Sequence, residues 1–124
     1  IQDKLAEANL TPTVNIVRSD GGVMSIEAAK QSPVNTLLSG PSGGAVAAAY
    51  VGKLAGFDKV LGFDMGGTST DVCVTLGGEP NLVRETRVGY YPVKASSVDV
   101  RTVGAGGGSI AHVPMTGALR VGPQ

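Results

Sequence analysis

The chain has 124 residues, and its ten basic and ten acidic side chains give a formal net charge of zero. A protein that binds nucleic acid through the phosphates carries an excess of Lys and Arg, so we expect no nucleic-acid partner. Hydrophobic residues make up 42% of the chain without a run long enough to cross a membrane, and one cysteine excludes an internal disulfide framework. We therefore expect a globular, cytoplasmic protein with no membrane partner.

Short elements are expected before residue 40. In chain order they are a helix over residues 1–8, a strand around residues 14–16, a turn over residues 19–22, a helix over residues 25–30 and an extended segment over residues 35–38. Thr11-Pro12 and Pro33 end the two helices, because proline lacks the N–H group that a helix interior needs. Ser25 is a suitable N-cap for the second helix.

Longer elements are expected in the middle of the chain. In order they are a Gly-rich loop over residues 39–44, an Ala-rich helix over residues 45–54 ended by Gly56, and a hairpin of two strands over residues 60–65 and 71–76. In the second strand, Val72, Val74 and Leu76 alternate and share one face. Further strands are expected over residues 82–88, 98–103 and 110–113. Strands beside helices predict an α/β fold with a mixed sheet.

The hairpin loop carries the richest chemistry in the sequence. Asp64 and Asp71 flank two glycines and three hydroxyl residues, which are Gly66, Gly67, Thr68, Ser69 and Thr70. The glycines leave backbone N–H groups open enough to form an anion-binding nest, and the hydroxyls add donors for phosphate oxygens. A carboxylate at a strand end holds Mg²⁺, often through water. The loop therefore predicts a phosphate site with its metal at Asp64, and the alternative is a hairpin with a solvated, Asp-rich tip.

A second glycine cluster, Gly40-Pro41-Ser42-Gly43-Gly44, matches the G-x-S-x-G nucleophile elbow of serine hydrolases. Asp99 and His112 follow Ser42 in the order that such a catalytic triad requires. The preceding strand is very short, however, and an α/β-hydrolase needs a larger parallel sheet than this chain holds. We prefer a Gly-lined helix start that packs tightly or faces an anion.

The third glycine cluster is Gly104–Gly108, followed by Ser109. The dinucleotide fingerprint G-x-G-x-x-G/A fails at Ser109, and no long helix follows. Gly106, Gly107 and Gly108 are therefore predicted to lie close to a bound group, and a flexible connector is the alternative. His112 is interpreted as structural, because no other metal ligand stands near it, and Cys73 as a packing residue.

Three ordered segments resemble signatures of the hydantoinase A/5-oxoprolinase family: Ser39–Ala45, Phe63–Val72 and Val103–Ala111. The closing Val121-Gly122-Pro123-Gln124 is similar to a segment that follows them in that family. Three motifs in order and at family spacing are more specific than any one of them. The resemblance covers the chain from about Val17 to its end.

The resemblance implies the superfamily of sugar kinases, actin and heat-shock chaperone ATPases, with a ribonuclease H-like mixed sheet and flanking helices. Its members bind ATP between two related domains, each of which supplies an Asp-Gly hairpin. It implies that residues 1–124 are an internal piece of one such ATPase domain, truncated at both ends. The second hairpin would lie in the remainder of the chain, so the piece is not expected to catalyse by itself.

The resemblance further implies ATP- and Mg²⁺-dependent hydrolysis of a cyclic amide such as 5-oxoproline or a hydantoin, with a phosphoryl group transferred to the amide oxygen. It assigns Mg²⁺ or a water to Asp64, phosphate to Gly66, Gly67 and Thr68, and a supporting carboxylate to Asp71. A second, B-type subunit is the expected partner. The alternatives are a subunit of an ATP-dependent ketone carboxylase and an actin- or chaperone-like nucleotide switch without metabolic chemistry.

Overall fold

The computed structural model describes residues 2–122, so Ile1 of the first expected helix and Pro123-Gln124 of the closing segment lie outside the described residues. The helices are α1 (Gln2–Glu7), α2 (Ile26–Gln31), the 3-10 helix η1 (Pro33–Thr36) and α3 (Ser39–Leu54). The strands are β1 (Asn15–Val17), β2 (Val23–Ser25), β3 (Lys59–Met65), β4 (Thr70–Leu76), β5 (Glu79–Pro80), β6 (Leu82–Val83), β7 (Thr86–Val88), β8 (Tyr91–Val93), β9 (Ser97–Val98), β10 (Val100–Val103), β11 (Ile110–His112) and β12 (Arg120–Gly122). Among residues 2–122, none of the helices has the length and apolar content that a membrane crossing requires.

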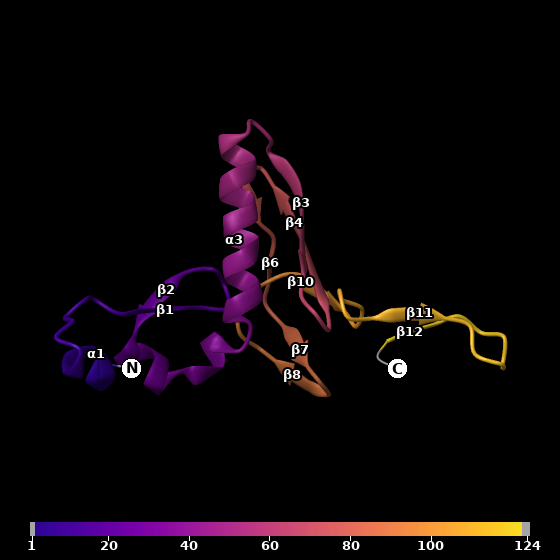
Figure 1. Ribbon diagram of the computed structural model, residues 1–124. Coiled ribbons are helices and arrows are strands. Elements are labelled where there is room, and N and C mark those ends of the chain that lie inside the picture. The colour runs from indigo at the N-terminus through magenta and orange to yellow at the C-terminus, as the bar shows by residue number, and fades with distance from the viewer. Residues whose placement is uncertain (1, 123–124) are drawn as a thin grey trace.

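The centre of the molecule is the long helix α3 packed on a small sheet (Figure 1). The sheet has the order β10-β4-β3, and β5 pairs with the far end of β4. This helix-on-sheet arrangement agrees with the predicted α/β class. Each strand pair in the described part of the chain is antiparallel, so the parallel pairs that a mixed sheet contains are not among these strands.

Helix α3 begins at Ser39, six residues before the predicted start at Ala45. The extended segment predicted for residues 35–38 is also wrong, because η1 occupies residues 33–36 and leads directly into α3. Glycine propensity argued against a helix over residues 39–44, but Pro41 in the first turn is compatible with one. Tertiary packing overrides the propensity here, since Ser42 and Ala45 are both buried against neighbouring elements.

The other end of α3 follows the prediction. Gly56 has a positive φ of 83°, and its N–H group donates to the Lys53 carbonyl at 3.1 Å. The Phe57 N–H group donates to the Gly52 carbonyl at 2.9 Å. Together these bonds form a Schellman C-cap, which requires the left-handed conformation that glycine adopts without strain.

Glycine also sets the distance between α3 and the hairpin. A Cβ added to Gly62 in β3 would lie 2.5 Å from the Cys73 sulfur and 3.3 Å from the Ala48 Cβ. A Cβ added to Gly52 in α3 would collide with the Val60 side chain. The missing side chains therefore allow the helix backbone to lie directly on the strands.

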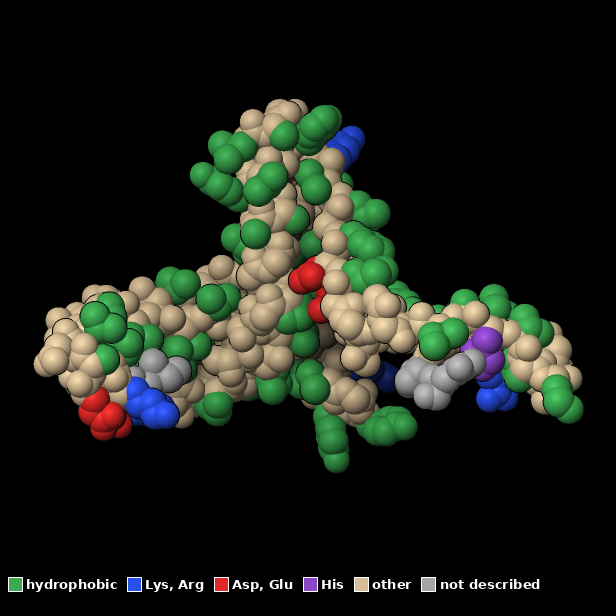
Figure 2. Space-filling view, viewed as in Figure 1, with side chains coloured by type: hydrophobic (Ala, Val, Ile, Leu, Met, Phe, Trp, Pro, Cys, Tyr) green, Lys and Arg blue, Asp and Glu red, His purple; other side chains and the backbone are tan. Residues whose placement is uncertain are grey.

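The opposite face of the sheet is apolar and open. Val72, Val74 and Leu76 share one face of β4 as predicted, and that face points away from α3. It carries six exposed hydrophobic side chains, which are Leu61, Phe63, Met65, Val74, Leu76 and Val103, and the register also places Lys59 and Arg101 on it. Figure 2 shows hydrophobic side chains gathered along this side of the central unit.

The remaining strands form small two-stranded units. The strand expected over residues 82–88 is divided into β6, which pairs with β9, and β7, which pairs with β8. The strand expected over residues 98–103 is likewise divided into β9 and β10. The β11–β12 hairpin projects from the central unit, as Figure 1 shows.

We predict that Gly62→Ala destabilises the protein by about 1–3 kcal/mol, because the new methyl group overlaps Cys73 between α3 and the hairpin. Gly43→Ala is the matched control, since a Cβ at Gly43 in the same helix–hairpin unit meets nothing within 4 Å. The control is expected to be neutral or to stabilise by up to about 1 kcal/mol, as alanine favours helix. Denaturant unfolding of both variants measures the difference, and equal midpoints would contradict the close-packing argument.

Candidate functional site

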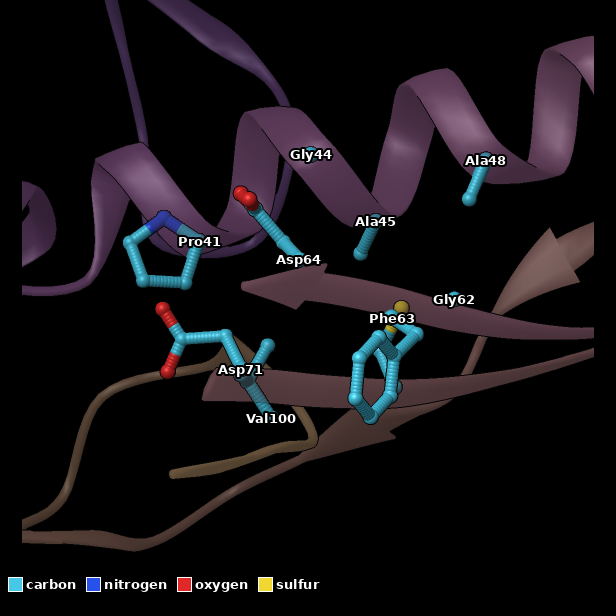
Figure 3. A pocket seen from close by; sticks show the side chains of 10 residues that line it. Pro41, Gly44, Ala45, Ala48, Gly62, Phe63, Asp64, Asp71 and Val100 are labelled. Carbon is cyan, nitrogen blue, oxygen red and sulfur yellow. The ribbon is translucent and has the colours of Figure 1, made fainter. Parts of the chain in front are cut away.

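Two carboxylates face each other near the tip of the β3–β4 hairpin. The register pairs Asp64 directly with Asp71, so both side chains leave the sheet on the face that α3 covers. Figure 3 shows the two carboxylate groups beside Pro41, at the start of α3. The Thr102 hydroxyl in β10 donates to Asp71 Oδ1 at 2.6 Å and thereby fixes the orientation of that carboxylate.

The hairpin tip presents backbone donors next to these carboxylates. The Gly66 N–H group donates to the Ser69 carbonyl at 2.9 Å and closes the turn. Within residues 2–122, the N–H groups of Gly67 and Thr68 have no hydrogen-bond partner. Adjacent open N–H groups on an exposed turn are donors that an anion-binding nest can use.

Thr70 differs from the other hydroxyl residues of the loop. It is 3% exposed, and its hydroxyl donates to the Ala105 carbonyl at 2.6 Å. Thr68 is exposed and Ser69 is half-buried, so these two hydroxyls remain closer to the surface of the tip. Thr70 therefore anchors the chain that follows β10, and its hydroxyl hydrogen is already engaged inside the protein.

The third glycine cluster lies against the same tip. Gly107 N–H donates to the Gly66 carbonyl at 2.8 Å, and Gly108 N–H donates to the Gly67 carbonyl at 2.7 Å. Gly106 N–H donates to Ser109 Oγ at 3.0 Å. The structure thus brings Gly106–Gly108 to the predicted site, but their three N–H groups bind protein atoms. A direct contact of these glycines with phosphate stays a prediction.

A cavity of about 270 Å³ lies between α3 and the sheet. Asp64 and Asp71 line it together with small residues of α3, including Gly44 and Ala45. Cys73 also lines the cavity, and burial raises the pKa of its thiol, although a backbone hydrogen bond involving Gly62 lowers it in part. A thiol with a raised pKa stays protonated near neutral pH, which fits the predicted packing role better than that of a nucleophile.

The two carboxylates at this site fit a hard cation that takes its remaining ligands from water or phosphate. No group of three or more His, Cys, Asp or Glu side chains that could hold a metal occurs within residues 2–122. Asp64 and Asp71 are like charges placed directly opposite each other, an arrangement that is unfavourable without a counter-charge. Mg²⁺ commonly takes one or two protein carboxylates and completes its shell with water and phosphate oxygens.

The serine hydrolase alternative is wrong. Ser42 lies inside α3 and not on a strand-to-helix elbow, and it is fully buried at 0% exposure. Its hydroxyl donates to the Ser19 carbonyl and pins the β1–β2 turn to the helix. Asp99 pairs with Arg101 at 3.1 Å, and His112 lies in the β11–β12 hairpin. The geometry of a nucleophile elbow is therefore absent at Ser42.

Residues 1–124 match the family model described as Hydantoinase/oxoprolinase over their whole length. The chain belongs to the hydantoinase/oxoprolinase family. It is 40% identical to 5-oxoprolinase 1 of Arabidopsis thaliana over 98% of the chain and 9% of that protein. It is 37% identical to caprolactamase subunit alpha of Pseudomonas jessenii over 86% of the chain and 15% of the subunit.

A solved structure extends the likeness to the fold. The nucleotide-free acetone carboxylase, from work on ATP-dependent acetone carboxylation, superposes with a TM-score of 0.81 at 30% identity. The match covers 100% of this chain and 17% of that one, and it confirms the α/β fold class of this ATPase-type domain. Across these relatives, the hydantoinase/oxoprolinase segment spans less than a fifth of the partner's length.

The structure adds Thr102 to the site and places Pro41 and Gly44, from the predicted Gly-lined helix start, on its cavity. Thr102 lies in an expected strand, but its contact with Asp71 depends on the pairing of β10 with β4. Pro41 and Gly44 line the cavity because α3 starts early and crosses the hairpin at the carboxylates. The sequence could have indicated the contact of Thr102 with Asp71 only through the alternation of side chains along the two strands. That inference also needs the register in which β10 pairs with β4.

We predict that Ser42→Ala in the full-length protein changes its turnover by no more than about twofold and costs about 1 kcal/mol of stability. The reason is that Ser42 Oγ is a buried donor to the Ser19 carbonyl and is shielded from substrate. Steady-state turnover and denaturant unfolding measure the two effects. Complete loss of turnover in a stably folded variant, or labelling of Ser42 by a fluorophosphonate, would restore the nucleophile interpretation.

Proposed function

We propose that the protein containing this segment uses ATP to open a cyclic amide by hydrolysis, and that this segment forms one phosphate-binding side of the nucleotide site. The observation that carries the proposal is the facing pair Asp64 and Asp71 beside the open N–H groups of Gly67 and Thr68. Similarity to 5-oxoprolinase and to caprolactamase supports the substrate class, because 5-oxoproline and caprolactam are cyclic amides.

The roles follow from the donors present. Asp64 and Asp71 hold Mg²⁺ through one or both carboxylates, and the Gly67 and Thr68 N–H groups donate to phosphate oxygens. When bound, Mg·ATP would supply a phosphoryl group to the amide oxygen, which would make the carbonyl carbon electrophilic toward water, so that the ring nitrogen could leave as an amine. The Thr102 hydroxyl keeps Asp71 in one orientation at 2.6 Å, which limits reorganisation around the metal. The positive end of the α3 dipole at Ser39–Pro41 stabilises negative charge nearby.

The proposal extends to the partners of the protein and to its location in the cell. A second, B-type subunit is the proposed partner, in keeping with the subunit name of the caprolactamase relative. The remainder of the polypeptide supplies the second half of the cleft and the pocket for the cyclic amide. A zero net charge and a single unpaired cysteine support a cytoplasmic location without a nucleic-acid partner.

A ketone carboxylase is the second candidate. The TM-score of 0.81 with acetone carboxylase supports this candidate, but the caprolactamase structure superposes almost as well, with a TM-score of 0.79 at a higher identity of 33%. The two reactions share activation by ATP. They differ in the group that is captured after phosphorylation. A nucleotide switch without a small substrate is the third candidate, and it predicts ATP turnover that no small molecule alters.

We predict that Asp64→Asn in the full-length protein lowers Mg·ATP-dependent turnover by at least about 100-fold. The neutral amide holds Mg²⁺ far more weakly than the carboxylate does, and without Mg²⁺ the phosphate charge is not offset. Asp58→Asn is the matched control, an exposed acid just before β3, at the end of that strand away from the tip. Turnover assays and circular dichroism of both variants provide the measurement. Turnover by Asp64→Asn comparable with that of the control would exclude this metal site.

We predict that ATP hydrolysis by the full-length complex rises at least about tenfold with one cyclic amide and does not rise with acetone plus bicarbonate. The panel contains 5-oxoproline, hydantoin and caprolactam, and product analysis detects the opened ring. A response to acetone plus bicarbonate alone would establish the carboxylase instead. ATP hydrolysis that stays constant across the panel would support the nucleotide switch.

A further inference from the structure

The segment that follows β10, residues 105–109, is here called the glycine loop. It leaves the sheet just after the Val103–Thr70 pair, which is the last rung between β10 and β4. The loop is fastened at both ends of a short turn. Thr70 Oγ1 donates to the Ala105 carbonyl at 2.6 Å, and the Ser109 N–H group donates to the Gly106 carbonyl at 2.9 Å. The first bond joins the loop to the hairpin, and the second closes the turn within the loop.

Two of its hydrogen bonds control consecutive peptide planes of the tip. The Gly66 carbonyl accepts from Gly107 at 2.8 Å, and the Gly67 carbonyl accepts from Gly108 at 2.7 Å. In a trans peptide unit, the carbonyl of one residue and the N–H group of the next point in opposite directions. Since the loop holds both carbonyls, the N–H groups of Gly67 and Thr68 must point away from the loop.

Close approach explains why glycine stands at the contact. A Cβ added to Gly106 would lie 2.6 Å from the Gly66 oxygen, 2.7 Å from the Ser69 nitrogen and 2.8 Å from the Gly67 carbonyl carbon. All three neighbours are backbone atoms of the tip, so no side chain can rotate to relieve the overlap. A Cβ on Gly104, immediately before the loop, meets nothing within 4 Å.

We infer that the glycine loop is a positioning element that orients the hairpin tip for phosphate. It directs the Gly67 and Thr68 N–H groups to one side by holding the two carbonyls on the other. Gly106, Gly107 and Gly108 then act through the tip, because their own N–H groups are engaged with protein atoms. This inference rests on the proposed phosphate site and assigns the glycine cluster a part in it.

The decisive comparison uses Gly106→Ala and Gly104→Ala in the full-length protein. Gly106→Ala is expected to weaken Mg·ATP binding at least about tenfold while adenosine binding stays within about twofold. Gly104→Ala should leave both affinities within about twofold. Equilibrium titrations with Mg·ATP and adenosine measure the ratio, which separates phosphate positioning from a general loss of structure. Unchanged Mg·ATP binding by a folded Gly106→Ala protein would overturn the inference.

A milder pair covers the case in which Gly106→Ala does not fold. Ser109→Ala removes the Oγ acceptor of the Gly106 N–H group without adding volume, and Ser109→Thr retains a hydroxyl. Ser109→Ala should weaken Mg·ATP binding about threefold or more with adenosine unaffected, and Ser109→Thr should restore it. Equal affinities in both variants and in the unsubstituted protein would refute the loop's role.

The Asp64→Asn protein separates this inference from the proposed function. Lost turnover in Asp64→Asn together with normal Mg·ATP binding in Gly106→Ala and Ser109→Ala would reject the positioning role alone. Full turnover in Asp64→Asn would reject the phosphate site on which the inference rests. Loss of turnover in Asp64→Asn with selective loss of Mg·ATP affinity in Gly106→Ala supports both.

Discussion

The site depends on the register of one antiparallel hairpin, which places Asp64 directly opposite Asp71. Like charges in such a cross-strand pair oppose folding by a few tenths of a kcal/mol up to about 1 kcal/mol. The surrounding structure accommodates them through the Thr102 hydrogen bond and the nearby start of α3. A shift of one residue in the register would send one carboxylate to the opposite, apolar face. The pairing of β3 with β4 is thus the constraint from which the geometry of the site follows.

Glycine enforces that geometry in two different ways. Gly62 and Gly52 remove side chains between α3 and the hairpin, so the helix start comes close to the carboxylates. Gly106 removes a side chain between two backbones on the other side of the tip. Because proteins stay close-packed, a methyl group at such a contact displaces a whole segment. Gly106 contacts the tip itself, whereas Gly52 contacts Val60 near the opposite end of the hairpin.

Sequence patterns predicted what is local. The hairpin, the C-cap at Gly56 and the N-cap at Ser25 follow from turn and cap chemistry, and the structure confirms them. Patterns failed where tertiary packing outweighs propensity, as at the start of α3 over residues 39–44. They also could not give the partners of Thr102 or Gly107, because those bonds join β10 and its following loop to a hairpin 31 and 41 residues earlier. The sequence therefore singled out Asp64 and Asp71, which the structure pairs across the hairpin, and missed the residues that hold them in place.

The segment is similar to proteins that act on different substrates, and this bears on its role in the whole protein. The chain is 40% identical to a 5-oxoprolinase and 37% identical to a caprolactamase subunit, and it superposes on acetone carboxylase with a TM-score of 0.81. These proteins act on different substrates, whereas the caprolactamase and acetone carboxylase of solved structure are both ATP-dependent. The likeness of this segment across all of them supports the proposal that it acts in the ATP-dependent step. The proposed phosphate and metal site draws on two carboxylates, two open N–H groups and a cavity of about 270 Å³ lined largely by small residues, a set that supports this proposal over one of discrimination between a lactam and a ketone.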